Sequence, residues 1–381
     1  MNDLKKTAII TYYYQSINYG GNLQAYALCK KLNDMGSDAE QLCFDARGES
    51  IKSGSLSQRI KRLLRKVKRL FLKKENTGFN KEVFTKREKA FYNFNSVLTP
   101  HSKDVYTRDT IKNCADNYDI FITGSDQVWN PNWYVPAYFL DFVSSPQKKV
   151  SYATSFGVSN FTEEQKSVIK AHLSDFSMIS LRENSVLEDD EVFPVQPEVL
   201  VDPTLLLSKK EWESLCLDCP VKEDYVFCYF FGDFEKSREL AKKYALENNL
   251  KLVSIPHLNG YNPNDVGLAD EEFIDASPEM FITLIKNAKC VFTDSFHAVV
   301  FSGILEKEYF VFERSANDTM KSRIYSITKL FHSEDRFLNG DESVNIEYIR
   351  SLSPIDYSRE NSELKQMKEK SFSYLERILQ L

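Results

Sequence analysis

The sequence predicts an α/β protein with two Rossmann-like, doubly wound domains that face each other across a cleft. Its 381 residues suit two domains of about 150–200 residues better than a single core. Short β-forming apolar runs alternate with helical patterns in two separate regions of the chain. Proline-bearing segments between residues 193 and 220 separate these regions and are typical of a linker.

The first region opens with a buried strand over residues 7–12, followed by a polar turn at 18–22 and a helical pattern that stops near Gly36. This order of strand, turn and helix is how a parallel α/β sheet begins. The later elements repeat the alternation. Strands are expected over 41–44, 118–123, 149–154 and 178–181, and a helix over 163–176.

The alternation restarts at residue 225 in the second region. Strands are expected over 225–231, 252–255, 290–293 and 309–312, and helices over 235–247, 278–288 and 295–305. The expected domains are 1–205 and 206–345, followed by a helical segment, 346–381, whose helix over 361–381 could pack on either domain. Two facing Rossmann-like domains resemble the GT-B architecture of glycosyltransferases.

Composition limits the kinds of partner. The chain is 42% apolar and 27% charged, as folded globular proteins are, and its net charge of −6 gives no reason to expect nucleic acid. Seven scattered cysteines indicate reduced thiols in a cytosolic protein. The one close pair, Cys216 and Cys219, lacks the further ligands of a zinc site, so we expect no metal. The longest apolar run, residues 225–231, is far shorter than the ~20 residues that span a bilayer.

Ligands of open parallel sheets bind beyond the carboxyl ends of the strands, so the loops there deserve most weight. The first such loop carries Asn18, Gly20, Gly21 and Asn22. Adjacent glycines let the backbone approach a ligand, and the N–H groups of a helix N-terminus favour anions. A purely structural tight turn would give the same pattern.

The second loop follows the strand that ends at Thr123 and reads Gly-Ser-Asp-Gln-Val-Trp-Asn. Ser125 and Asp126 offer groups that hydrogen-bond sugar hydroxyls, and the Trp129 indole offers a flat stacking surface, so this loop suits a carbohydrate. The alternative is that Asp126 caps a turn and Trp129 lies in the core.

Arg182 occupies the carboxyl end of the strand expected over 178–181. A guanidinium group has five N–H donors in a planar fork, which matches a carboxylate or a phosphate at two points. A structural ion pair with Glu183 or Asp202 is the alternative.

A fourth loop, at residues 293–297, follows the strand over 290–293. Ser295 has the side chain of an N-cap, which places His297 in the first helical turn beside exposed backbone N–H groups. A bound anion there would favour the protonated imidazole, whereas the helix dipole disfavours it. We interpret His297 as functional rather than as a core histidine, since it alone among five histidines follows a buried strand in this way.

Six segments in this order make the chain similar to the polysaccharide pyruvyl transferase family, from the first strand to slightly beyond Phe312. The segments that carry the resemblance are NYGGNLQAYAL (18–28), FITGSDQVWN (121–130), SYATSFG (151–157), SLRENSV (180–186), VDPTLLL (201–207) and TDSFHAVVFS (293–302).

The resemblance implies transfer of a pyruvyl unit from phosphoenolpyruvate to two hydroxyls of one sugar in a bacterial surface polysaccharide (capsule or exopolysaccharide). The products are a cyclic ketal and phosphate, and phosphoenolpyruvate is a co-substrate, with no cofactor. Arg182 and His297 match the family's donor-site arginine and histidine, and Ser295 adjoins them. The first two loops, Asn18 to Asn22 and Ser125 to Trp129, are expected on the acceptor side, in the N-terminal domain.

The family often has a lysine that contacts the donor in the stretch after the histidine loop. Here Arg314, Lys321 and Arg323 are the candidates, and we favour Arg323. In the implied chemistry, His297 protonates the donor's methylene carbon, and the arginines stabilise the departing charge. Glu183, Asp126 or Asp294 accepts the hydroxyl proton, and the sequence does not rank these three.

Two other functions fit part of the pattern. A GT-B-like glycosyltransferase that uses a nucleotide sugar would account for two domains and sugar-suited loops. It accounts less well for an arginine and a histidine that follow separate strands and are positioned to bind a small dianion. A non-enzymatic scaffold for glycan assembly at a membrane surface is the third reading, and intact Arg182 and His297 argue against it.

The segment 57–75 is expected to be a basic amphipathic insertion. Residues 59–74 include nine Lys or Arg and no acid, and six apolar residues repeat at helical spacing. Such a helix suits an anionic bilayer, with core packing, disorder or a protein partner as alternatives. We therefore expect a cytoplasmic protein bound peripherally to the inner face of the cytoplasmic membrane, with a lipid-linked acceptor.

Overall fold

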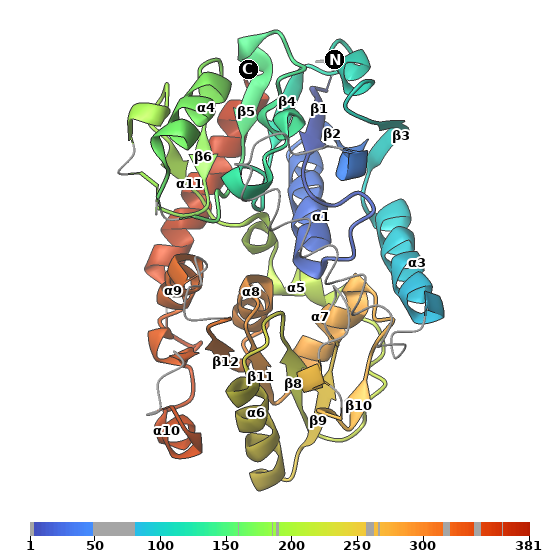
Figure 1. Ribbon diagram of the computed structural model, residues 1–381, viewed down its shortest axis with the longest axis vertical. Coiled ribbons are helices and arrows are strands. Elements are labelled where there is room, and N and C mark those ends of the chain that lie inside the picture. The colour runs from blue at the N-terminus through green and yellow to red at the C-terminus, as the bar shows by residue number, and fades with distance from the viewer. Residues whose placement is uncertain are drawn as a thin grey trace.

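A computed structural model describes residues 4–48, 81–158, 160–184, 186–187, 190–256, 263–265, 267–314, 321–338, 344–359 and 361–381. The basic segment at 59–74 lies outside these residues. Figure 1 shows two α/β units, one above the other, each with a parallel sheet and helices around it.

The N-terminal unit is built on a five-stranded parallel sheet of order β3-β2-β1-β4-β5. A parallel pair, β6-β7, continues it through a bridge from Thr154 to Leu181. The strands are β1 (Lys6–Ile10), β2 (Asp38–Phe44), β3 (His101–Tyr106), β4 (Ile120–Thr123), β5 (Lys149–Ser151), β6 (Ser180–Leu181) and β7 (Glu198–Val199). The helices are α1 (Tyr19–Asp34), α3 (Lys81–Leu98) and α4 (Glu163–Leu173), with 3₁₀ helices η1 (Ala46–Gly48), η2 (Ile111–Cys114), η3 (Pro131–Trp133), η4 (Pro136–Phe139), η5 (Pro146–Lys148), η6 (Asp190–Val192) and η7 (Pro203–Leu206).

The second unit is built on a six-stranded parallel sheet of order β10-β9-β8-β11-β12-β13. Its strands are β8 (Tyr225–Tyr229), β9 (Lys251–Ser254), β10 (Glu271–Glu272), β11 (Cys290–Thr293), β12 (Glu308–Phe312) and β13 (Phe337–Leu338). The helices from here on are α5 (Lys209–Glu213), α6 (Glu235–Glu247), α7 (Pro278–Asn287), α8 (Phe296–Ile304), α9 (Lys321–Leu330), α10 (Ile346–Ser351) and α11 (Ser362–Leu379), with η8 (Pro263–Asp265) and η9 (Glu334–Arg336).

The sequence pattern located the buried strands well and the solvated elements poorly. Helix α6 and strand β11 have the predicted bounds, and every other predicted strand and helix is present with small shifts at its ends. Helix α3 and strand β3 were not predicted. Strand β3 lies at the edge of its sheet and exposes residues 103–105, so it lacks the continuous apolar run that marks a central strand.

The glycine loop differs from the prediction, because α1 begins at Tyr19 instead of after Asn22. The Asn18 side chain accepts a hydrogen bond from Gly21 N at 3.1 Å and so acts as the N-cap. Gly20 and Gly21 therefore lie inside the first helical turn.

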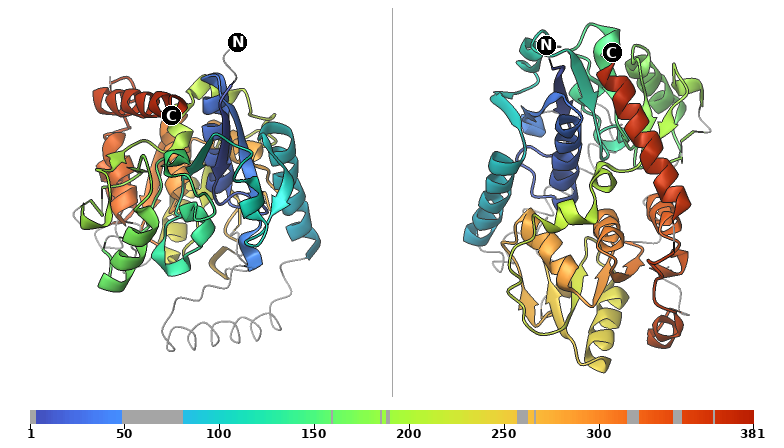
Figure 2. Two further views of the ribbon diagram at one scale, coloured as in Figure 1. Left: turned by 90° about the horizontal axis from the view of Figure 1, so that it is seen from above. Right: turned by 180° about the vertical axis from the view of Figure 1, so that it is seen from behind.

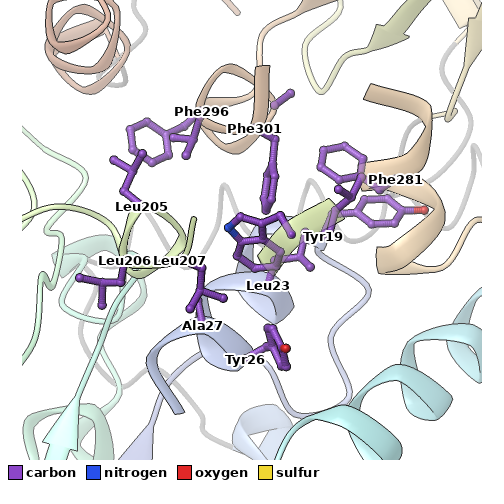
Figure 3. Close-up of a cluster of buried hydrophobic side chains, with 14 of the residues drawn as sticks. Tyr19, Leu23, Tyr26, Ala27, Leu205, Leu206, Leu207, Phe281, Phe296 and Phe301 are labelled. Atoms are coloured by element: carbon purple, nitrogen blue, oxygen red, sulfur yellow. The ribbon is translucent and has the colours of Figure 1, made fainter. Parts of the chain in front are cut away.

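The two units meet over an apolar interface that forms one core cluster with both sheets. The Tyr19 ring of α1 stacks on Phe281 of α7 with 4.7 Å between ring centroids, and its hydroxyl donates to the Ala276 carbonyl at 2.8 Å. Figure 3 shows Leu23, on the next turn of α1, in the same cluster as Phe301 of α8. Burial of this much apolar surface stabilises the arrangement of α1 against α7 and α8.

Helix α11 packs back on the N-terminal unit, which resolves the alternative left by the sequence. Ser371 Oγ accepts a hydrogen bond from Val201 N at 3.1 Å, and the Tyr374 hydroxyl donates to the Ser151 carbonyl at 3.0 Å. The helix runs alongside that unit in the right-hand view of Figure 2. The chain thus returns to its first sheet after completing the second one.

We expect Tyr374→Ala to lower the free energy of unfolding by about 3–5 kcal/mol, because it removes a buried aromatic ring. Tyr374→Phe, which loses only the hydrogen bond to Ser151, should cost about 1 kcal/mol. Denaturant unfolding of both variants measures this. Glu376→Ala, at an exposed position of the same helix, is the control and should change stability by less than about 0.5 kcal/mol. Equal stability of Tyr374→Ala and the control would contradict the docking of α11.

Candidate functional site

Arg182 directly follows β6, as predicted, and its guanidinium group is buried between the two units. Nη1 donates to Asp202 Oδ2 at 2.8 Å, and the guanidinium carbon lies 4.5 Å from the centre of the Phe296 ring. Nε and Nη2 have no hydrogen-bond partner among the described residues. Glu183 Oε2 and Asp126 Oδ1 lie 3.8 and 3.9 Å away, too far for hydrogen bonds. The ion pair offered as the alternative is therefore present and still leaves two donors for a ligand.

His297 lies in the first turn of α8, and Ser295 is the N-cap, both as predicted. The Ser295 hydroxyl accepts from Ala298 N at 3.4 Å. His297 Nε2 is 3.5 Å from Asp202 Oδ2, so one carboxylate oxygen lies between the imidazole of the second unit and Arg182 of the first. Burial alone would raise the pKa of Asp202. The pKa is nevertheless below its ordinary value, because the carboxylate is stabilised by the charges of His297 and Arg182 and by hydrogen bonds, including one from Thr204.

Arg323, on α9, is the member of the three candidate cations that the structure brings beside Arg182. It is buried, and this burial together with the charge of Arg182 lowers its pKa to about 10. The Gln127 amide, with its oxygen turned toward Arg323, accepts from both terminal nitrogens at 2.8 and 2.7 Å. The Nε of Arg323 has no hydrogen-bond partner within the described part of the chain.

The other two cations are held elsewhere. The Arg314 side chain lies over Phe231 at 4.5 Å and donates from Nε to the Asp294 carbonyl at 3.1 Å. Lys321 pairs with Glu313 at 2.7 Å.

Gly20 contributes to the site in a way that the sequence did not predict. Its Cα lies so close to His297 that a Cβ built at residue 20 would overlap the imidazole at Nδ1. Gly21 is similarly confined, because a Cβ there would lie 2.7 Å from the Tyr12 carbonyl oxygen. The two glycines therefore permit close packing of α1 against the His297 loop and Tyr12, and the expectation that Gly20 contacts the acceptor is wrong.

Three further residues that were expected on the acceptor side are structural. The Asn22 side chain is buried and donates to the carbonyls of Ser16 and Asn18. The Ser125 hydroxyl is buried and donates to the Ala153 carbonyl at 2.6 Å. Trp129 is 0% exposed, which leaves no face for a sugar. Its ring stacks on Phe139 and its Nε1 donates to the Tyr138 carbonyl, so the core alternative is correct.

A cavity of about 450 Å³ opens beside these residues on the N-terminal unit. Of the predicted acceptor residues, Asn18 and Asp126 line it. Trp133, which is 42% exposed, takes the place expected for Trp129. The sequence around Trp133 could have indicated that this tryptophan is exposed. It follows Asn-Pro-Asn, which favours a turn, instead of a buried strand. The lining residues are Tyr12, Ser16, Asn18, Ala46, Asp126, Gln127, Trp133 and Val135.

Asp294 has a structural role at the first strand of the second sheet. Its two carboxylate oxygens accept from Phe231 N and Gly232 N at 2.8 and 2.7 Å. Burial raises the pKa of this carboxyl group. These N–H groups follow β8, where a dinucleotide-binding fold holds a pyrophosphate, and here a side chain occupies them. Within the described ranges, no three His, Cys, Asp or Glu side chains are grouped to hold a metal ion.

Comparison with protein families decides the assignment. A family model described as polysaccharide pyruvyl transferase matches residues 18–315, which is most of the chain. The chain belongs to the polysaccharide pyruvyl transferase family. No curated protein matches it in sequence.

Solved structures show the fold of this pyruvyl transferase family member. A protein from Listeria monocytogenes assigned as a UDP-N-acetylglucosamine 2-epimerase matches with a TM-score of 0.53 at 11% identity, covering 96% of this chain and 91% of that one. UDP-GlcNAc 2-epimerase from Neisseria meningitidis, bound to UDP-GlcNAc, matches with a TM-score of 0.50 at 10% identity over 99% and 100%. At these identities the likeness concerns the fold alone, and it confirms the predicted GT-B-like pair of Rossmann-like domains.

We expect Gly20→Ala to abolish the activity of this transferase family member while the protein still folds, because the new methyl group displaces the His297 imidazole. A double-mutant cycle tests this explanation. Gly20→Ala should lower the free energy of unfolding by about 1–3 kcal/mol in the wild type and by much less in His297→Ala, where the overlap is absent. Identical costs of Gly20→Ala in the two backgrounds would contradict the proposed overlap.

Proposed function

We propose that this protein transfers a pyruvyl group from phosphoenolpyruvate to a sugar of a surface polysaccharide precursor, forming a cyclic ketal and releasing phosphate. Membership of the pyruvyl transferase family supports a transferase that acts on polysaccharide. The observation that carries the proposal is the convergence of Arg182, His297 and Arg323, from both domains, in a buried site with unsatisfied N–H donors.

The donors suit a small ligand with two anionic groups. Arg182 Nε and Nη2 and Arg323 Nε are buried without a hydrogen-bond partner in the described structure. A buried donor left unsatisfied costs about 1–3 kcal/mol, more when it is charged, so a ligand that accepts from these groups recovers that cost on binding. Phosphoenolpyruvate has a carboxylate and a phosphate close together, and arginine recognises either group at two points.

Catalysis then requires a proton and two new carbon–oxygen bonds. His297 gives a proton to the methylene carbon, and the first sugar hydroxyl attacks the adjacent carbon, where positive charge develops. The second hydroxyl of the same sugar forms another bond to that carbon as its bond to the phosphate oxygen breaks. Of the two hydroxyl protons, one replaces the proton lost by His297 and the other leaves with phosphate. The two arginines stabilise the negative charge on the departing phosphate.

The nucleotide-sugar alternative has weaker support at this site. A pyrophosphate would need additional N–H donors, and the pair that follows β8 is already bound to Asp294. The charge of Arg182 is also partly compensated by its ion pair with Asp202, which leaves capacity for a small dianion more than for a nucleotide.

We expect Arg182→Ala to fold like the wild type, lose turnover and weaken phosphoenolpyruvate binding by about 10–100-fold, since charge-assisted hydrogen bonds contribute about 1.5–3 kcal/mol. His297→Gln should lose turnover but retain most of the binding, because its role is proton transfer. Calorimetry with phosphoenolpyruvate and assays for released phosphate and released nucleotide make the measurements.

Arg350→Ala is the matched control, because that exposed arginine pairs with Glu247. Its helix, α10, lies at the end of the second domain away from the first (Figure 1). Retention of a third or more of the wild-type rate by both site variants would show that the site is misassigned. Release of nucleotide from a nucleotide sugar, without phosphate from phosphoenolpyruvate, would establish the glycosyltransferase alternative.

The proposal extends to a lipid-linked acceptor at the inner face of the cytoplasmic membrane, with residues 59–74 as the docking segment. None of the described helices has the length and apolar character needed to cross a bilayer. The support for docking is the sequence, in which nine cations and no acid accompany an apolar stripe at helical spacing.

We expect the protein to float with anionic vesicles, to be released by salt, and to lose binding when Lys66, Lys68 and Arg69 become Glu. Each cation near an anionic surface contributes about 1 kcal/mol, so three charge reversals remove most of the attraction. A liposome flotation assay measures this, with Lys242, Lys243 and Lys365 changed to Glu as the matched control. Absence of binding to anionic vesicles at low salt would contradict membrane docking.

A further inference from the structure

The cavity beside Asp126 is a second site, separate from the arginine cluster and adjoining it. We infer that it binds a neutral pyranose of the acceptor, stacked on Trp133, and that Asp126 is the base that takes the proton from the attacking hydroxyl. This inference rests on the proposed pyruvyl transfer and names the acceptor class and a catalytic residue that the family match does not supply.

Trp133 is positioned as a stacking surface. It ends η3, a turn fixed by Pro131 at its first position and by Asn130, whose side chain accepts from Asn132 N at 2.9 Å. Trp133 is 42% exposed and lines the cavity. An aromatic face with free edges suits the apolar face of a pyranose ring.

The remaining walls divide into an apolar part and a polar part. Tyr12 is held against Tyr138 with 4.4 Å between ring centroids, and it adjoins Val135 at the cavity. Ser16, Asn18 and Gln127 place hydroxyl and amide groups at the same cavity. Mostly apolar walls with a few polar groups that fix orientation are typical of small-molecule sites, and 450 Å³ lies in their usual range of about 300–1,000 Å³.

The charge of the lining indicates which sugars bind. Among the lining residues that the structure describes, Asp126 is the one with a charged side chain, and no Lys or Arg is present. A uronic acid or a sugar phosphate would place its negative charge near this carboxylate without a cation to compensate it. The cavity therefore selects a neutral pyranose.

Geometry separates the three carboxylates that the sequence left unranked. Asp294 is held by two backbone N–H groups, and Glu183 is buried, accepts from Ser155 Oγ at 2.6 Å and does not line the cavity. Asp126 lines the cavity, and its Oδ1 is 3.9 Å from Arg182 Nη2. It is thus the carboxylate that adjoins both the acceptor cavity and the donor cluster.

The backbone holds Asp126 in this position. Its φ of +70° lies in the left-handed region, which Asp tolerates better than most residues, and its carbonyl accepts from Ser155 N at 2.9 Å. In the reaction, a sugar O–H bond breaks as its oxygen bonds to the central carbon of the donor. The proton passes to Asp126, and from there through solvent it replaces the proton that His297 gave to the donor, while the proton of the second hydroxyl leaves with phosphate.

Tryptophan fluorescence tests the sugar site directly. The chain has three tryptophans, and Trp129 and Trp212 are fully buried, so a bound sugar changes the emission and acrylamide quenching of Trp133. The probes are methyl β-galactoside, methyl α-mannoside and methyl N-acetyl-β-glucosaminide, with methyl β-glucuronide as the acidic probe. We expect a saturable response to at least one neutral glycoside, none to the glucuronide, and no response in Trp133→Phe.

Kinetics test the base. With the responsive glycoside as acceptor, Trp133→Ala should raise the KM for the glycoside about tenfold or more, and Trp133→Phe should restore most of it. Asp126→Asn should lower kcat by about 10²–10⁴. Phosphoenolpyruvate affinity should stay within about twofold of wild type in all three variants. Tyr92→Ala, at an aromatic residue of α3 that is 71% exposed, is the control for loss of a surface ring.

Two outcomes overturn the inference. One is that no neutral glycoside perturbs Trp133 while phosphoenolpyruvate binds normally. The other is that Asp126→Asn keeps a third or more of the wild-type kcat. Failure of the proposed function is a distinct result, because the wild type then binds no phosphoenolpyruvate by calorimetry whether or not glycosides perturb Trp133.

Discussion

The close packing of α1 against α8 is the constraint on which the site depends. Gly20 allows the backbone of the first domain to touch the His297 imidazole of the second. The Tyr19 ring, stacked on Phe281 of the neighbouring helix α7, packs the same end of α1 against the second domain. As a result, Asp202 reaches both Arg182 and His297 with one oxygen. Arg182 and His297, which the sequence assigned to one site, thus come from different domains and meet where the two domains join.

The apolar interface also offsets the free-energy cost of burying several charged side chains. Arg182, Arg323, Asp202 and Glu183 are all buried in one region, and removing such charges from water costs several kcal/mol each. Pairing offsets only part of that cost, since several donors remain unsatisfied. Burial of the aromatic cluster around Tyr19 stabilises the same interface, so these charged side chains are held in fixed positions.

The positions in the fold that the sequence predicted correctly depend on local rules. Arg182 and His297 were found because each follows a buried strand, and an N-cap such as Ser295 marks the start of a helix wherever it occurs. Trp129 and Trp133 are four residues apart, and only the packing of Phe139 and Phe176 decides which ring enters the core. The choice of Arg323 over Arg314 likewise depends on tertiary contacts, with Gln127 for one and with Phe231 for the other.

Helix α11 has a consequence for the order in which the protein matures. A ribosome completes β1 to β7 long before it reaches residues 362–379, and until then the surface that Tyr374, Leu375 and Ile378 cover stays open to water. The first domain is thus synthesised early but lacks α11 until the entire second sheet has been synthesised. During that interval the nascent chain exposes the apolar surface that these side chains later cover, and a chain truncated before α11 exposes it permanently.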